Sequence, residues 1–265
     1  YKNIWNPNIG WMWNRTLDCN WQEPVDILLY DNGWVEGNAA QYTWWVPHDV
    51  NGLTKLIGSR EAFTKKLNES FEKASKHDFA SGKSHDKELT KELRRVFINY
   101  GNQPCIPTAY LFNFSGSPWL TQYWSRQVVN KMYSGISPEF GYSGDEDQGL
   151  MGSLAVLMKS GLFSTNGGTS TEPYYEISSP IFSKITFNLN PKYYSGGTFT
   201  IEAKNNKSKN YYIQSAQING KALDRPWILH KTVINGGKLT LDMGKNPNKQ
   251  WGSKPEQAPP SMTMN

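Results

Sequence analysis

Ser-Arg-Glu-Ala-Phe-Thr-Lys-Lys-Leu-Asn-Glu-Ser-Phe-Glu-Lys-Ala-Ser-Lys, residues 59–76, sets the character of the first part of the chain. Its apolar residues recur at helical spacing, and lysine and glutamate occupy the opposite side. Ser59 precedes the periodic run and is a preferred helix-capping residue. The stretch therefore predicts an amphipathic surface helix whose apolar face consists of Ala62, Phe63, Leu67, Phe71 and Ala74.

Two further helices follow from the same signals. Ser117-Pro118 supplies a cap with proline at the first helical position, and apolar residues follow at helical spacing as far as Met132. Another helix is expected from about Asp145 to a stop at Gly161. With short helices near Gln41 and Thr108, the helices are too few to close a helical barrel by themselves.

After residue 170 the hydrophobic period changes to two, which is typical of strands. We expect residues 1–170 to form the C-terminal part of a helical domain, residues 171–250 an antiparallel β segment, and residues 251–265 a loosely ordered tail, because Pro, Asn, Gly, Ser and Gln dominate from Asn246 onward. The chain begins with neither Met nor a leader, so a fragment of a larger protein is expected. The predicted strands lie at 184–189, 198–203, 211–216, 227–230 and 238–243.

Composition narrows the function classes. The formal net charge is +5, but the lysines are scattered over the predicted helix surface and the later turns, which argues against a nucleic-acid groove. Cys19 and Cys105 are the only cysteines and lack metal-site spacing. No apolar run approaches the length of about 18 residues that a membrane span requires. The aromatic fraction of 14% suits either sugar-binding rings or an aromatic core.

The segment Gly33-Trp-Val-Glu-Gly-Asn-Ala-Ala-Gln-Tyr-Thr-Trp-Trp-Val-Pro-His-Asp49 places one glutamate among large rings and amides. Nearby rings would disfavour the charged form of Glu36 and raise its pKa, as a general acid needs. A surface glutamate near a helix start is the alternative. His48, after Pro47, is more typical of a hydrogen-bonded residue that ends a helix than of a metal ligand, and without a second His nearby it is not a catalytic candidate. The candidate substrate-binding residues are Trp34, Asn38, Gln41, Trp44, His48 and, farther along, Trp119.

A second acidic motif, Gly144-Asp-Glu-Asp-Gln-Gly149, supplies the other carboxyl group that cleavage of a glycosidic bond requires. Asp145 and Asp147 lie between glycines at an expected helix start, where the helix dipole favours their ionised form. They are therefore candidates for the general base. An ordinary acidic helix cap is the alternative.

The turn Tyr100-Gly-Asn-Gln-Pro104 exposes amide and carbonyl oxygens. With a nearby aspartate these oxygens suit the oxygen-only shell that Ca²⁺ prefers. Taken alone, the motif is an ordinary turn. The candidate metal ligands are Asn102, Gln103 and Asp147.

Together, these motifs resemble glycoside hydrolase family 92. The segment 34–49, the turn 100–104 with the run 109–119, the acidic motif 141–149, and the later segments 179–184 and 212–216 follow in the family's order. The resemblance implies a calcium-dependent, exo-acting, inverting α-mannosidase of periplasmic or extracellular location, acting on α-mannoside glycans. It covers only the family's C-terminal portion, so it also implies the last helices of an (α/α)6 barrel followed by closing strands, with an N-terminal part of the same protein as partner.

By the same resemblance, Glu36 corresponds to the general acid, Asp145 and Asp147 to the pair that supplies the base, and Asn102 with Gln103 to the calcium turn. The family usually has Gly-Asn-Glu-Pro-Ser-His-His at this turn, whereas this chain has Gly101-Asn-Gln-Pro-Cys-Ile-Pro107. Loss of the charged ligand lowers the expected calcium affinity. A carbohydrate-binding relative with weakened catalysis is therefore the alternative function, and a purely structural or adhesin-like role is a third.

Overall fold

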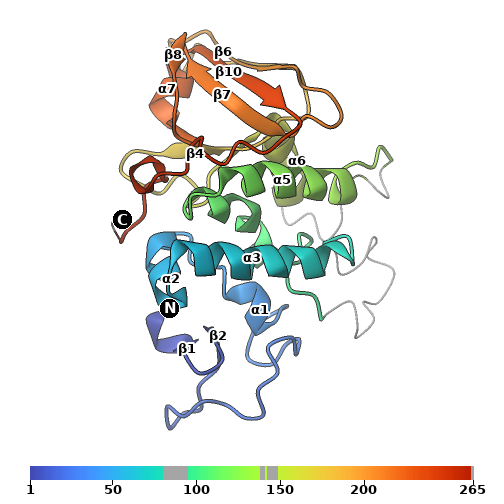
Figure 1. Ribbon diagram of the computed structural model, residues 1–265, viewed down its shortest axis with the longest axis vertical. Coiled ribbons are helices and arrows are strands. Elements are labelled where there is room, and N and C mark those ends of the chain that lie inside the picture. Colours follow the sequence, from blue (N-terminus) through green and yellow to red (C-terminus); the bar gives the residue numbers. More distant parts are fainter. Residues whose placement is uncertain (80–94, 138–140, 142–148, 264–265) are drawn as a thin grey trace.

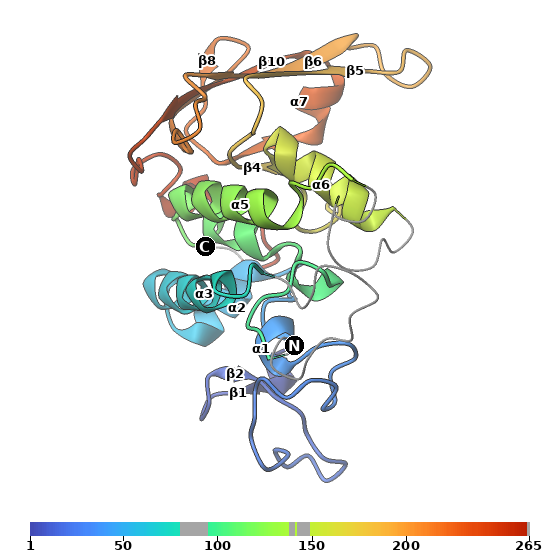
Figure 2. The ribbon, with the colours of Figure 1, turned by 90° about the vertical axis from the view of Figure 1, so that its right-hand side faces the viewer.

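The computed structural model describes residues 1–79, 95–137, 141 and 149–263 (Figure 1). Figure 2 shows a β-sheet at one end of the molecule, helices α5 and α6 beneath it, and α3 in the next layer. The small hairpin of β1 (Trp5–Asn6) and β2 (Trp11–Met12) lies at the opposite end. The helices of the described residues are α1 (Ala39–Tyr42), α2 (Val50–Ile57), α3 (Arg60–Ser75), α5 (Pro118–Met132), α6 (Leu150–Ser160), α7 (His230–Ile234) and the 3-10 turns η1 (Lys2–Ile4), η2 (Gln103–Cys105), η3 (Thr108–Asn113) and η4 (Pro255–Gln257).

The two strongest helix predictions are confirmed. Helix α3 begins after Ser59, whose hydroxyl accepts a hydrogen bond from the Ala62 N–H at 3.1 Å. Helix α5 begins at Pro118, but the Ser117 side chain makes no capping hydrogen bond. Proline alone favours this start because its fixed φ suits the first helical turn.

The start of α6 and the presence of α2 differ from expectation. Helix α6 begins at Leu150, and Asp145, where we expected its start, lies outside the described residues. Gly161 ends it in the left-handed conformation, as predicted. Helix α2 was not predicted. It forms although Asn51 and Gly52 are weak helix formers, because the Asp49 side chain caps it by accepting from the Gly52 N–H.

The main sheet has five strands in the order β5-β6-β10-β7-β8. The prediction of antiparallel strands throughout is wrong, because β10 pairs parallel to β6. After β8 the chain leaves this sheet through β9 and α7, and such a crossover permits parallel pairing on its return. The strands are β5 (Lys184–Asn188), β6 (Thr198–Lys204), β7 (Tyr212–Ile218), β8 (Lys221–Ala222) and β10 (Gly237–Gly244).

A second sheet, which the sequence did not predict, joins β3 (Leu162–Phe163), β4 (Tyr174–Ile177) and β9 (Trp227–Leu229). The strand predicted at 227–230 is confirmed as β9, but it belongs to this sheet, and β3 and β4 were not predicted. Two hydrophobic cores divide close to Gly161: one extends from Met12 to Met158, and the other begins at Leu162. The change from helix to strand therefore comes about ten residues before the expected boundary at residue 170.

The expectation of a loosely ordered tail from residue 251 is contradicted as far as Thr263. Trp251 is buried, and its indole N–H donates to the Leu223 carbonyl at 2.8 Å. Farther on, the N–H and hydroxyl of Thr263 each donate to the Asp49 carboxylate at 2.8 Å. Local composition suggested disorder, but contacts with residues distant in sequence hold this segment against both parts of the molecule.

Candidate functional site

Glu36 lies on the loop that precedes α1, and both polar groups of its backbone are held. Its N–H donates to Asp31 Oδ1 at 2.8 Å, and its carbonyl accepts from Asn102 Nδ2. Its φ of 53° is left-handed, which is uncommon for a residue other than glycine. The Glu36 side chain itself is exposed. The expectation of a partly buried carboxyl group is therefore not met in this chain.

The expectation failed because the neighbouring rings point elsewhere. Trp44 is fully buried in the helical core against Trp11 and Phe63, and Trp45 is exposed. Among the described residues, the rings of Trp34 and Tyr42 form a wall near Glu36, with their centroids 5.3 Å apart. Burial, and then the negative charge of Glu36, raise the pKa of Tyr42.

The Tyr42 hydroxyl fixes this wall to the loop. It donates to the Val35 carbonyl at 2.6 Å. A side chain at Gly37 would come within 2.8 Å of the Tyr42 ring and 3.0 Å of Gln41 Oε1, so only glycine permits this close approach. The Trp34 indole N–H is buried and has no hydrogen-bond partner among the described residues.

Asn38 and Gln41 face the protein interior. Asn38 Oδ1 caps α1 by accepting from the Gln41 N–H at 3.0 Å. Their amide groups both donate to the Val96 carbonyl, at 3.2 and 3.0 Å, and both residues are buried. These contacts anchor α1 and do not support the predicted contact with substrate.

His48 and Trp119 lie in other surroundings. The His48 ring packs edge-on against Tyr1, and its carbonyl accepts from the Met262 N–H at 3.1 Å. It precedes α2 and does not end a helix. Trp119, at the start of α5, lines a hollow of about 420 Å³ with Arg60 and other residues from α3. The structure thus does not gather the predicted substrate-binding residues into one pocket.

The predicted calcium turn is held by hydrogen bonds and adjoins the Glu36 loop. Asn102 Oδ1 accepts from the Gln103 N–H at 2.8 Å, and Asn102 Nδ2 makes the bond to Glu36 described above. The turn is tied to the core because the Tyr133 hydroxyl donates to the Tyr100 carbonyl at 2.9 Å. Burial raises the pKa of the Cys105 thiol to about 12, so this cysteine is not a reactive thiolate.

The other predicted carboxyl groups, Asp145 and Asp147, lie outside the described residues. Within the described ranges, no group of three or more His, Cys, Asp and Glu side chains is arranged to hold a metal ion. The sequence interpretation missed Asp31, which holds the Glu36 N–H. The signal for it was the turn sequence Asp31-Asn-Gly33, because Asp in such turns accepts nearby backbone N–H groups.

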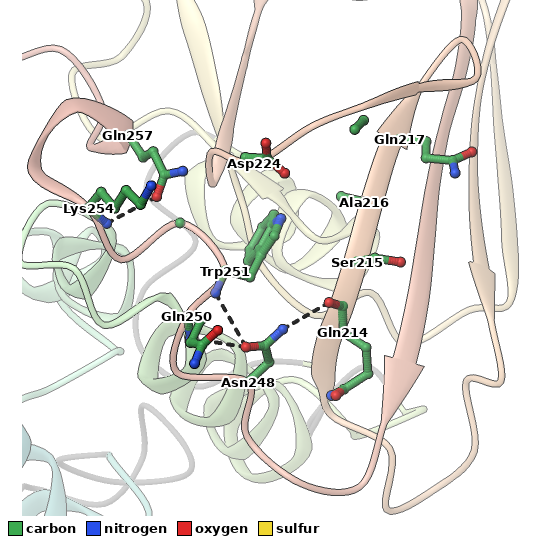
Figure 3. Close-up of a pocket in the computed structure, with 12 residues that line it drawn as sticks. Gln214, Ser215, Ala216, Gln217, Asp224, Asn248, Gln250, Trp251, Lys254 and Gln257 are labelled. Atoms are coloured by element: carbon green, nitrogen blue, oxygen red, sulfur yellow. Dashed lines mark hydrogen bonds between the residues drawn. The ribbon is translucent and has the colours of Figure 1, made fainter.

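A separate polar hollow of about 370 Å³ lies beside β7 and the C-terminal segment (Figure 3). Asn248 links its two sides: its Nδ2 donates to the Gln214 carbonyl at 2.9 Å and its Oδ1 accepts from the Gln250 N–H at 3.0 Å. Asp224 and Trp251 also line it. Of the residues predicted for catalysis, substrate or metal that the structure describes, none lines this hollow.

A model of the glycosyl hydrolase family 92 catalytic domain matches residues 1–245. The chain belongs to glycosyl hydrolase family 92. Among curated proteins, this family 92 chain is 30% identical over 249 residues to an uncharacterized secreted glycosidase of Arthroderma benhamiae, covering 93% of this chain and 27% of that protein.

Two solved structures from Bacteroides thetaiotaomicron are similar to the family 92 chain over nearly its whole length. A family GH92 α-mannosidase has 28% identity and a TM-score of 0.81, covering 100% of this chain and 32% of its own. A family GH92 inverting mannosidase has 31% identity and a TM-score of 0.81, and the match covers 98% of this chain and 34% of the mannosidase. The chain therefore spans about a third of the length of these relatives.

Among the described residues, no helix is both long and apolar enough to cross a membrane.

Proposed function

We propose that the protein is an exo-acting, inverting α-mannosidase in which Glu36 is the general acid. The observation that carries this proposal is an exposed carboxyl group on a loop whose backbone is held from both sides, beside the Trp34–Tyr42 wall. Family membership and the two mannosidase structures support the substrate class.

In this proposal, Glu36 protonates the departing glycosidic oxygen, and Asp145 or Asp147 activates the attacking water. Because Glu36 is exposed, a bound mannoside must displace the water around its carboxyl group before that group becomes an effective acid. The neighbouring Trp34 and Tyr42 rings offer apolar faces against which the C–H groups of a sugar ring can pack.

We also propose that Ca²⁺ assists catalysis. Asn102 and Gln103, with Asp147, would hold the ion, and Asn102 Oδ1 keeps a second lone pair beyond its bond to the Gln103 N–H. When bound, Ca²⁺ would engage sugar hydroxyls and ease distortion of the ring. Two of these ligands are neutral amides, so affinity is expected to be modest. A rise in melting temperature on adding Ca²⁺, reversed by chelation, would test binding independently of activity.

We further propose that the protein works outside the cytoplasm and that its helices belong to an (α/α)6 barrel, which additional polypeptide completes. The location is supported by the secreted glycosidase of Arthroderma benhamiae, and the additional polypeptide by the fraction of each relative that this chain spans.

The test is the stereochemistry of hydrolysis by the complete protein. We expect an aryl α-mannoside to yield β-mannose as the first product in a proton NMR time course with Ca²⁺ present. If α-mannose is formed first, the inverting mechanism is wrong. If no hydrolysis of any α-mannoside is detected, the mannosidase proposal itself is wrong.

One observation favours a second candidate, a carbohydrate-binding relative with weakened catalysis. Cys105 and Ile106, which follow the predicted calcium turn, are buried in the helical core and offer no polar group to a substrate. Calorimetric binding of an α-mannoside without turnover would support this alternative.

A further inference from the structure

The left-handed backbone of Glu36 requires support from its surroundings. A residue other than glycine with a φ of 53° is strained, because its Cβ approaches the following carbonyl. Asp31, five residues earlier, also has a positive φ of 57°. The loop therefore keeps this shape only where hydrogen bonds outweigh the strain.

Asn102 provides such a bond from a distant segment. Its Nδ2 donates to the Glu36 carbonyl, whereas its Oδ1 accepts from the Gln103 N–H at 2.8 Å. Only 8% of the Asn102 surface is exposed. One amide group thus joins the Glu36 loop to the turn at residues 99–103.

That turn is itself fixed to the core. The Gly101 N–H donates to Asn99 Oδ1 at 2.9 Å, and the Asn102 N–H donates to the Asn99 carbonyl at 3.2 Å. The fully buried Tyr133 hydroxyl, just beyond the end of α5, donates to the Tyr100 carbonyl at 2.9 Å. A continuous set of short contacts therefore runs from the helical core through Asn102 to Glu36.

We propose that Asn102 is a positioning residue for Glu36, acting through its Nδ2 donor on the Glu36 backbone and separately from any part its oxygen takes in binding metal. The proposal rests on the proposed role of Glu36 as general acid. A proton donor must lie within hydrogen-bond reach of the departing oxygen, and a displacement of about 1 Å can lower the rate on the order of 10²-fold.

The proposal is tested in the complete protein with Asn102→Asp. This change keeps an oxygen that can accept from the Gln103 N–H and bind a cation, but removes the donor to Glu36. Asn248→Asp is the matched control, because the Asn248 amide also donates to a backbone carbonyl and its oxygen also accepts from the backbone, here from the Gln250 and Trp251 N–H groups in the β part of the molecule.

We expect Asn102→Asp to lower kcat/KM at least about tenfold for an α-mannoside with a poor leaving group, and much less for one with a good leaving group that needs no protonation. Asn248→Asp should leave both values unchanged. Equal losses on both substrates would overturn the proposal, since misfolding or metal loss affects both alike.

Hydrogen exchange provides a second measurement that does not depend on activity. Amides of residues 31–37 should exchange at least about tenfold faster in Asn102→Asp and at the wild-type rate in Asn248→Asp. Unchanged exchange in Asn102→Asp would overturn the positioning role. If the wild-type protein hydrolyses neither mannoside, the proposed function fails, and exchange still decides whether Asn102 holds the loop.

Discussion

The helical and β parts of the molecule use their aromatic residues differently. Of the twelve largest fully buried side chains among the described residues, all aromatic, ten lie between Trp13 and Tyr133, and the other two, Tyr174 and Phe199, belong to the β part. The core beneath the main sheet is mostly aliphatic. The comparison shows that the aromatic richness of this chain serves mainly to pack the helical part. Near Glu36, Trp34 and Tyr42 remain partly exposed, with their ring centroids 5.3 Å apart.

The largest effect on stability is expected where a ring of the aromatic helical core is removed. The Phe71 ring contacts the rings of Phe79, Tyr100 and Phe112. It stacks on Trp124 with the two ring centroids 5.1 Å apart. We expect Phe71→Ala to lower the free energy of unfolding by about 3–5 kcal/mol, because it removes a fully buried ring and leaves a cavity.

Phe187 on β5 is the control for this prediction. It is only partly buried against the second core. Phe187→Ala should therefore cost only about 1–2 kcal/mol. Urea denaturation of both variants measures the two losses in free energy of unfolding. Equal losses would show that the aromatic core contributes no more to stability than the core beneath the main sheet.

Two buried carboxyl groups, one in each part of the molecule, have pKa values shifted in opposite directions. Asp49, in the helical part, accepts hydrogen bonds from Tyr1, Gly52, Ser261 and Thr263. Burial tends to raise its pKa, but these donors outweigh burial and lower the pKa to about 2. Glu176, on β4, is fully buried, and the hydrogen bonds found for its carboxylate come from the Thr165 N–H. Burial dominates there and raises the pKa to about 7.

For Asp49, the lowered pKa gives stability that is present above the ordinary value of 3.8 and is lost as the pH falls through about 2. We expect Asp49→Ala to cost about 2–4 kcal/mol at pH 7, since it also leaves the hydroxyls of Tyr1 and Thr263 without their acceptor. Thermal unfolding from pH 2 to 7 measures this. A cost that did not shrink in acid would contradict the account.

For Glu176, stability depends on pH in the opposite direction. Its stabilising contribution is complete below the ordinary value of 4.5 and is lost as the pH rises through about 7. Glu176→Gln, which keeps an acceptor for the Thr165 N–H, should stabilise the protein by about 2 kcal/mol at pH 8 and have little effect at pH 4. Denaturation at both pH values compares the variant with wild type. Equal effects at both would show that this carboxyl group does not titrate as argued.

Local patterns predicted the elements that depend on local signals. Helix α3 has a complete apolar face and a Ser59 cap, and strands β5, β6 and β10 alternate clearly. Helix α2 escaped prediction because tertiary contacts of Asp49 offset the poor helix propensity of Asn51 and Gly52. The parallel pairing of β10 with β6 depends on where the chain returns to the sheet, which residue alternation does not specify.

In the candidate site, too, the sequence pattern did not indicate the contacts between residues distant in the chain. Glu36 stands out in the sequence as a single carboxyl group among rings, but the pattern did not indicate that Trp44 turns into the core or that Asn38 and Gln41 bind Val96. The bond from Asn102 to Glu36 joins residues 66 positions apart. Such contacts arise from folding of the whole helical part, so a short motif cannot reveal them.

The most direct test of the central claim is the leaving-group dependence of Glu36→Gln in the complete protein. If Glu36 is the general acid, kcat/KM should fall at least about 10²-fold for an α-mannoside with a poor leaving group and far less for an activated aryl mannoside. Unchanged turnover of the poor substrate would contradict the account, because Glu36 would then not be the proton donor.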